Sequence, residues 1–200
     1  MIAPKKQIRI IGIDDTAHKK KQKNPVLVIG AIFRGGEYMD NMLSTFVKVD
    51  GNDATAKIAE MINKSRAKGS LRVIMLDGIA LAGFNVIDIQ LLHKKTKLPV
   101  IVVTRNMPDF NSIKKALKHF SDGGKRWNLI RKAGQVCKME VKHRELAKPA
   151  KIYFQFSGLS EQETRRILKL TIQHGVVPEP VRVAHIIGQG ISLGESRGRA

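Results

Sequence analysis

The sequence is poor in cysteine, in aromatic residues and in acidic residues, and it lacks any long apolar run. Its single cysteine, Cys137, has no partner within the chain, which excludes a disulfide-rich secreted scaffold and favours a reducing compartment. Apolar runs such as Val26–Phe33 fall well short of the ~18 residues that a membrane-spanning helix needs. Met1–Arg9 also lacks the apolar stretch of a signal peptide. We therefore expect an untargeted cytoplasmic protein.

Acidic residues are scarce enough to leave a large positive charge. The 200 residues, a length typical of one domain, include 36 lysines and arginines but 17 aspartates and glutamates, a formal net charge of +19. The excess is concentrated in residues 114–151, which hold twelve basic and three acidic residues. Such a cationic surface favours a polyanionic partner, nucleic acid before others, although lysine-rich surfaces also serve solubility alone.

Short β-branched apolar runs predict strands that are covered on both faces. Amphipathic patterns between them predict crossover helices, and Gly35-Gly36 suits the turn of an antiparallel hairpin. In chain order we predict strands at Gln7–Ile13, Pro25–Arg34 and Met42–Val49, a helix at Asp53–Lys68, a strand at Leu71–Leu76, a helix at Asn85–Lys95 and a strand at Pro99–Val103.

This order is that of an RNase H-like α/β fold. Its mixed sheet has strands 1–3 antiparallel and strands 4–5 parallel, with flanking helices. A doubly wound nucleotide-binding fold is the alternative, but it requires a crossover helix after the first strand. His18–Lys23 is too short to supply that helix.

The second half of the chain predicts a basic, helical C-terminal extension (about 121–200) of the same single domain, beyond a core at about 7–120. We expect helices at Asp109–Phe120, Lys125–Ala133 and Ser160–His174, and a strand at Ile152–Phe156. Pro178 and Pro180 are expected to break the chain before an apolar segment at 181–187. The glycine-containing tail, 188–200, either wraps phosphate or has no fixed structure.

Carboxylates follow the predicted strands and suggest a metal site. Asp14-Asp15 follows the first strand and Asp77 follows the fourth, so in parallel neighbours both acids emerge at the carboxyl edge of the sheet. A third acid is expected after strand three, where Asp50 and Asp53 are the candidates. Carboxylate oxygens completed by water suit Mg²⁺ or Mn²⁺, which polarise a phosphodiester and activate water. The alternative for each acid is turn or helix-cap chemistry.

Basic residues supply candidate nucleic-acid contacts. The single tryptophan, Trp127, has basic neighbours in the sequence: Lys125, Arg126, Arg131 and Lys132. An aromatic ring among cationic residues is typical of a site that stacks an unpaired base. An amphipathic helix that buries its tryptophan is the competing interpretation. Arg197 in the tail is a further phosphate candidate, and His18 is a weaker site candidate near Asp15.

Several segments resemble the archaeal endonuclease dU family, which is related to endonuclease V. They are GIDD at 12–15, VIMLDGIALAGFNVID at 73–88, PVIVVTRNMP at 99–108 and PEPVRVAHIIGQGISLGESRGRA at 178–200. The resemblance implies metal-dependent cleavage of DNA that contains deoxyuridine. It implies that Asp14, Asp77 and either Asp50 or Asp53 hold the metal. It also implies that His185 orients water or the scissile phosphate, and that Arg105, where endonuclease V has Lys, grips phosphate.

Two departures limit what the resemblance implies. Endonuclease V has Glu after its third strand where this chain has Asp, and its Pro-Tyr-Ile-Pro-Gly wedge is not recognisable around Ser44–Val49. The leading hypothesis is a divalent-metal-dependent endonuclease acting on uracil-containing or similarly deaminated DNA. The alternatives are a non-catalytic nucleic-acid-binding protein on the same fold, including one for structured RNA, and a small-molecule phosphohydrolase.

Overall fold

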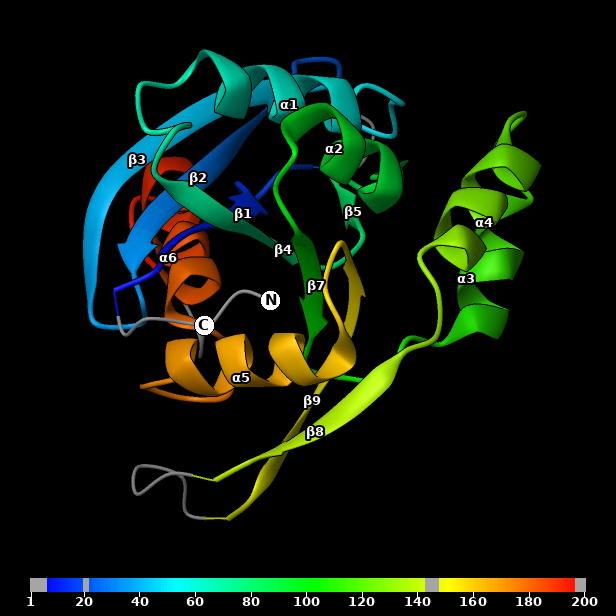
Figure 1. Ribbon diagram of the computed structural model, residues 1–200. Helices are drawn as coiled ribbons and strands as arrows, with labels where there is room; N and C mark the ends of the chain where they lie inside the picture. Colours follow the sequence, from blue (N-terminus) through cyan, green and yellow to red (C-terminus); the bar gives the residue numbers. More distant parts are fainter. Residues whose placement is uncertain (1–6, 20–21, 143–147, 197–200) are drawn as a thin grey trace.

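A seven-stranded mixed sheet forms the centre of the molecule in the computed structural model, which describes residues 7–19, 22–142 and 148–196 (Figure 1). The strand order is β3-β2-β1-β4-β7-β9-β8. The strands are β1 Arg9–Asp15, β2 Val26–Arg34, β3 Tyr38–Val47, β4 Leu71–Asp77, β7 Val100–Thr104, β8 Cys137–Val141 and β9 Ala150–Ser157. A small second sheet pairs β5 (Ala80–Leu81) with β6 (Asn85–Val86).

The pairing directions confirm the predicted RNase H-like fold. β1, β2 and β3 are antiparallel, β4 lies parallel to β1, and β7 lies parallel to β4. The extension does not form a separate layer, because β9 pairs antiparallel with β7, and β8 pairs with β9. The main sheet therefore runs continuously across residue 120, where the core and the extension were expected to meet.

Helices cover both faces of this sheet and build two hydrophobic cores. α1 (Ala54–Lys64) and α2 (Ile89–Thr96) pack on one face, and α5 (Glu161–Thr171) and α6 (Glu179–Leu193) pack on the other. β1 serves both cores by alternation: Ile11 and Ile13 point to the first face, and Ile10 points to the second. α3 (Phe110–Leu117) and α4 (Gly123–Lys132) stand to one side of the sheet (Figure 1).

The expectation of a broken chain and a glycine-containing tail after Pro178 is wrong for residues 179–193, which form the single helix α6. Pro178 precedes the helix and Pro180 lies in its first turn, where a missing backbone N–H breaks no helical bond. Gly188 sits inside the helix against the backbone of Asp15 and Thr16. The two prolines therefore start a helix, and the tail expected at 188–200 begins later.

Two further boundaries differ from the sequence prediction. Asn85 and Val86 form β6, and α2 begins at Ile89, because the Asp88 side chain caps it by accepting the N–H groups of Gln90 and Leu91. β8 was not predicted from the sequence. No helix in the described part of the chain is long and apolar enough to cross a membrane.

Candidate functional site

Two carboxylates meet at the carboxyl edge of the sheet because β1 and β4 run parallel and in register. Ile13 is paired with Leu76, so the next residues, Asp14 and Asp77, stand side by side at the strand ends. Alternation along each strand turns both side chains to the same face as Ile10 and Met75. That face is the one that α5 and α6 cover.

α6 adds an imidazole to these carboxylates. His185 lies in the middle of the helix, and its Nδ1 is 2.7 Å from Oδ2 of Asp14. The approach of α6 to β1 depends on Gly12: a Cβ at that position would come within 2.1 Å of the Pro180 carbonyl carbon. Gly12 therefore allows the helix to lie directly on the strand that carries Asp14.

Asp14, Asp77 and His185 form a compact set of potential metal ligands. One ligand atom from each side chain lies within 4.8 Å of those of the other two. Burial and the neighbouring Asp14 raise the pKa of Asp77 to about 6, and a hydrogen bond with Asp14 raises the pKa of His185. Two carboxylates crowded in this way offer the oxygen ligands that suit a divalent cation such as Mg²⁺ or Mn²⁺.

Asp15 points to the opposite face and holds the loop that follows β4. Its Oδ2 accepts the Ala82 N–H at 2.9 Å and lies 3.3 Å from Nδ1 of His18. Burial, followed by the charge of Asp14, raises the pKa of Asp15 to about 6. His18 is thus close to Asp15, as its position in the sequence suggested, but it lies outside the group of Asp14, Asp77 and His185.

The two candidates for the third acid also lie outside that group. Oδ1 of Asp50 accepts the Phe84 N–H at 2.8 Å, and the Asp50 N–H donates to the Ala82 carbonyl at 2.8 Å. Oδ1 of Asp53 accepts Nδ2 of Asn85 at 2.7 Å. Both carboxylates therefore fasten the segment after β3 to the loop after β4.

Arg126 belongs to this internal network and does not take the phosphate-contacting place expected of it. The residue is 8% exposed. Its guanidinium donates to the backbone carbonyls of Phe84 and Asp50 and pairs with Asp122 at 2.7 Å. It thereby links α4 to the segment after β3 and to the loop after β4, and its charge is already paired within the protein.

The other basic candidates among the described residues are exposed. Arg105 follows β7, and its charge lowers the pKa of both Asp77 and His185, so it lies near these candidate ligands. Lys125 and Arg131 lie on the open side of α4, whereas Lys132 pairs with Asp88 at 3.0 Å. Arg197 lies outside the described residues.

Trp127 packs within the protein, as an amphipathic helix predicts. It is half-buried, its ring meets that of Phe110 edge-on at 6.1 Å, and Nζ of Lys114 lies 5.8 Å from its centroid. These contacts favour a structural role for Trp127 over the interpretation that its ring stacks an unpaired base.

Gln189 is a residue of the site that the sequence analysis missed. Its Nε2 lies 3.0 Å from Nε2 of His185, one helical turn away. In a helix, residues four apart lie on the same side, so the spacing of Gln189 from His185 predicts this contact. Because residues 188–200 were expected to form a tail, the sequence did not predict the contact.

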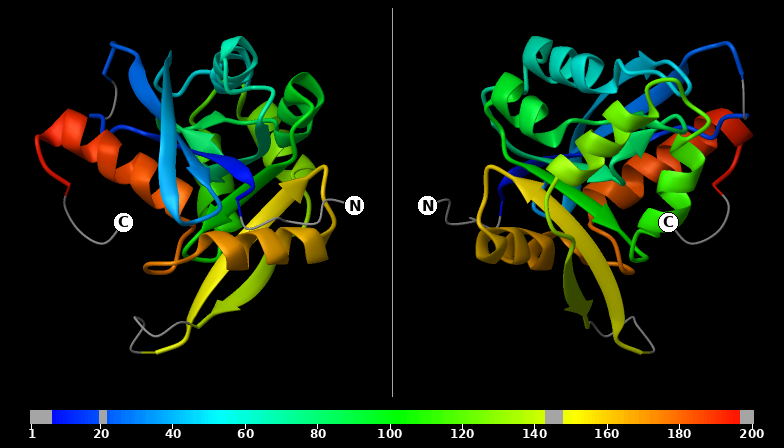
Figure 2. Two further views of the ribbon diagram at one scale, coloured as in Figure 1. Left: turned by 60° about the vertical axis from the view of Figure 1, so that its left-hand side comes forward. Right: turned by 90° about the vertical axis from the view of Figure 1, so that its right-hand side faces the viewer.

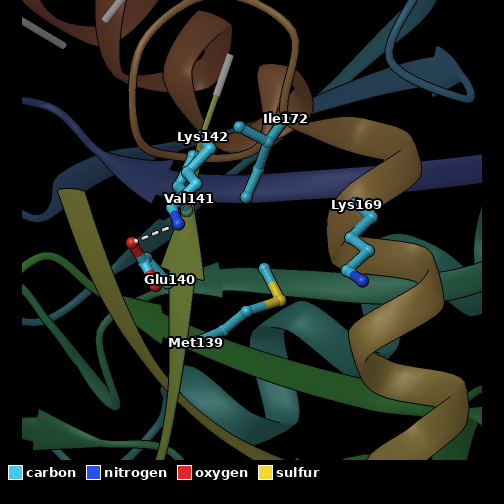
Figure 3. A pocket seen from close by; sticks show the side chains of 6 residues that line it. All are labelled: Met139, Glu140, Val141, Lys142, Lys169 and Ile172. Carbon is cyan, nitrogen blue, oxygen red and sulfur yellow. Dashed lines mark ion pairs between the residues drawn. The ribbon is translucent and has the colours of Figure 1, made fainter. Parts of the chain in front are cut away.

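A separate cavity of about 490 Å³ lies between β8 and α5 (Figure 3). Its lining combines apolar side chains with lysines, and Lys142 is paired with Glu140 at 3.1 Å. None of the metal-ligand candidates lines it. This cavity is therefore distinct from the carboxylate cluster.

The family model for endonuclease dU matches residues 6–192. The chain belongs to the endonuclease dU family. Two relatives are named UPF0215 protein: that of Methanothermobacter thermautotrophicus is 46% identical, over 98% of this chain and 93% of its own length. That of Methanosarcina mazei is 47% identical, over 98% of this chain and 96% of its own.

Solved structures show the same fold. A protein of unknown function from Archaeoglobus fulgidus has a TM-score of 0.79 at 33% identity, covering 92% of this chain and 97% of that one. Endonuclease V of Bacillus subtilis has a TM-score of 0.58 at 11% identity, covering 92% and 80%. Ciona intestinalis endonuclease V, bound to DNA containing an inosine followed by a ribo-adenosine, has 0.56 at 14% identity, covering 89% and 83%. The RNase H-like fold is therefore confirmed, and the family and fold support a nuclease.

Proposed function

We propose that this protein is a divalent-metal-dependent endonuclease that hydrolyses a phosphodiester in DNA containing deoxyuridine or another deaminated base. The observation that carries the proposal is the convergence of Asp14, Asp77 and His185 at the carboxyl edge of two parallel strands. The family to which the chain belongs supports deoxyuridine as the base, and the inosine-containing DNA of the Ciona complex supports deaminated bases more widely.

The chain's own residues would divide the work as follows. Asp14 and Asp77 would hold a Mg²⁺ or Mn²⁺ ion, which would polarise the phosphodiester and lower the pKa of a water molecule. His185 donates its Nδ1–H to Asp14, because a carboxylate can only accept, and this contact fixes the carboxylate's orientation. Nε2 of His185 then accepts from the Gln189 amide.

Cationic groups around the cluster would bind the substrate. Arg105 is exposed beside Asp77, where a guanidinium can grip a phosphate through two parallel hydrogen bonds. Lys125 and Arg131 on α4 extend the positive surface available to the phosphate backbone. The damaged base would be recognised after it turns out of the stack.

The experiment that tests the proposal compares end-labelled oligonucleotides that are identical except for one deoxyuridine, one deoxyinosine or one thymidine. Each is incubated with wild-type protein in Mg²⁺, Mn²⁺ or EDTA, and with the Asp77→Asn variant purified in parallel as a control for contaminating nucleases. We expect cutting at one position of the deoxyuridine strand with metal, and none in EDTA or with Asp77→Asn. Cutting that persists in Asp77→Asn would refute the site.

A non-catalytic nucleic-acid-binding protein is the second candidate, and one observation favours it. Asp50 and Asp53 bond to neighbouring loops, so neither adds a third carboxylate to Asp14 and Asp77. Under this alternative the same oligonucleotides are bound and remain uncut with either metal. Cutting that requires metal excludes it.

A further inference from the structure

An exposed aromatic side chain on the sheet face that carries Asp14 has no role in the site described so far. Phe46 lies on β3, the edge strand of the sheet, and is 57% exposed. Its neighbour Val47 is fully buried in the core. The backbone of this part of β3 is therefore held in place while the Phe46 ring faces solvent.

The register of the sheet places Phe46 on the same face as Asp14. Asp14 is paired with Ile29, and Ile29 is paired with Ser44, so these three side chains form one row across β1, β2 and β3. Phe46 is paired with Leu27, whose carbonyl accepts the Thr16 N–H at 2.9 Å. Phe46 therefore belongs to the next row towards the carboxyl edge of the sheet, where Asp14 lies. It is two strands, or about 10 Å, away from β1.

α6 supplies apolar side chains to the same place. Ile187 and Leu27 pack against one hydrophobic cluster between α6 and β2. Ile191 follows Ile187 by one helical turn, on the same side of α6, and is 57% exposed. We call these four residues the apolar shelf: Leu27 and Ile187 in the cluster, Phe46 paired with Leu27, and Ile191 one turn after Ile187. Figure 2 (left) shows α6 beside β2, on which it packs.

Exposed lysines are close in the chain to the strand residues of this apolar shelf. Lys48 comes two residues after Phe46, and Lys19 and Lys23 lie in the connection between β1 and β2 that ends beside Leu27. An aromatic side chain among cationic groups is how proteins bind unpaired nucleotides: the base stacks on the ring while the cations meet its phosphates. The shelf also shares a sheet face and edge with Asp14.

We propose that the apolar shelf binds an unpaired nucleobase of the substrate strand beside the scissile phosphodiester, with the base stacked on Phe46. The inference rests on the proposed function, in that nucleic acid occupies the metal cluster. The occupant is a nucleobase and not a second copy of the chain, because a second copy would bring another +19 of charge against the same lysines.

The test measures binding of a fluorescent single-stranded, deoxyuridine-containing oligonucleotide in EDTA, where no cutting occurs. Phe46→Ala is expected to weaken binding about 5- to 150-fold, the range for removal of one base–aromatic stack. Phe46→Trp is expected to keep the affinity. Phe46→Ile, which suits a strand and stays apolar but lacks the ring, is expected to lose it as Phe46→Ala does. The salt dependence of binding is expected to stay unchanged, because no phosphate contact is removed.

The matched control is Met42→Ala. Met42 is exposed on the same strand and lies four residues, or about 13 Å, farther from the carboxyl edge than Phe46. It is expected to bind as the wild-type protein does. A series of oligonucleotides, each with one base removed, then locates the stacked base. Removal of the base at one position is expected to weaken binding to the wild-type protein and to have no further effect on binding to Phe46→Ala.

Three results would each overturn the inference. The first is unchanged DNA affinity in Phe46→Ala, and the second is an equal loss of affinity in Phe46→Ala and Met42→Ala. The third is a loss of affinity that is the same at every abasic position. Sedimentation showing a wild-type dimer that both variants dissociate without loss of DNA affinity would also overturn it, since the shelf would then join two copies. Cleavage assays separate this inference from the proposed function: a wild-type protein that cuts while Phe46→Ala binds normally refutes the shelf alone. A protein that never cuts but loses affinity in Phe46→Ala refutes the nuclease alone.

Discussion

The Asp77→Asn substitution is expected to stabilise the metal-free protein while it abolishes metal binding. Burial and the charge of Asp14 raise the pKa of Asp77 from 3.8 to about 6. A folded-state pKa above the unfolded one means that the folded protein prefers the protonated carboxyl. The associated stability is present below pH ~4 and is lost as the pH rises through about 6.

The size of this effect follows from the same shift. At about 1.4 kcal/mol per pKa unit, the ionised Asp77 lowers the free energy of unfolding by roughly 3 kcal/mol at pH 7.5. Asparagine has nearly the same shape and no charge, so it removes most of that cost. For a chain of this length we expect a midpoint of thermal unfolding about 6–12 °C higher than that of the wild-type protein in EDTA.

The assay is thermal and denaturant unfolding in EDTA at pH 7.5 and pH 4. The gain is expected at pH 7.5 and should shrink towards zero at pH 4, where wild-type Asp77 is protonated. Added Mg²⁺ or Mn²⁺ should stabilise the wild-type protein, more at pH 7.5 than at pH 5.5 because binding requires deprotonated ligands, and should leave Asp77→Asn unchanged. The control is Asp109→Asn, at an exposed helix cap where hydrogen bonds with Ser112 lower the pKa, so no gain is expected. An Asp77→Asn protein that is no more stable than wild type at pH 7.5 would contradict the reasoning.

Three further predictions concern Gly12, Asp53 and the exposed basic residues of α4. Gly12→Ala should force α6 away from β1, because a Cβ there comes within 2.1 Å of the Pro180 carbonyl carbon; we expect a loss of stability of several kcal/mol and of metal-dependent activity, measured by unfolding and cleavage. Asp53→Asn should keep the metal-induced rise in thermal stability, since that carboxylate bonds to a neighbouring loop; loss of this rise would make Asp53 a ligand after all. Replacing Lys125 and Arg131 together by alanine should weaken binding to all DNA sequences alike and reduce the log–log salt slope by about 0.7 to 0.9 per lost phosphate contact, measured by titration at several salt concentrations; an unchanged slope would move the DNA path elsewhere.

Local sequence patterns were sufficient for the central part of the fold. β1, β4 and β7 are short β-branched runs buried on both faces, a pattern typical of the central strands of a sheet that helices cover on both sides. Because β1 and β4 end in aspartates, the meeting of Asp14 and Asp77 at one sheet edge followed from topology alone. The position of His185 in the site was implied by resemblance, since a histidine in an apolar segment does not by itself reveal its partner.

Tertiary packing decided the features that depend on contacts between distant parts of the chain. His185 bonds to Asp14 across 171 positions of sequence, and this requires the close approach of α6 that Gly12 permits. The charges of Asp50 and Arg126 suggested site residues, yet both hold loops, because a half-buried carboxylate and a buried guanidinium need hydrogen-bonding partners. Residue type and spacing thus determined which strands form and where their acidic ends meet, whereas burial and long-range packing determined which charged side chains face the site.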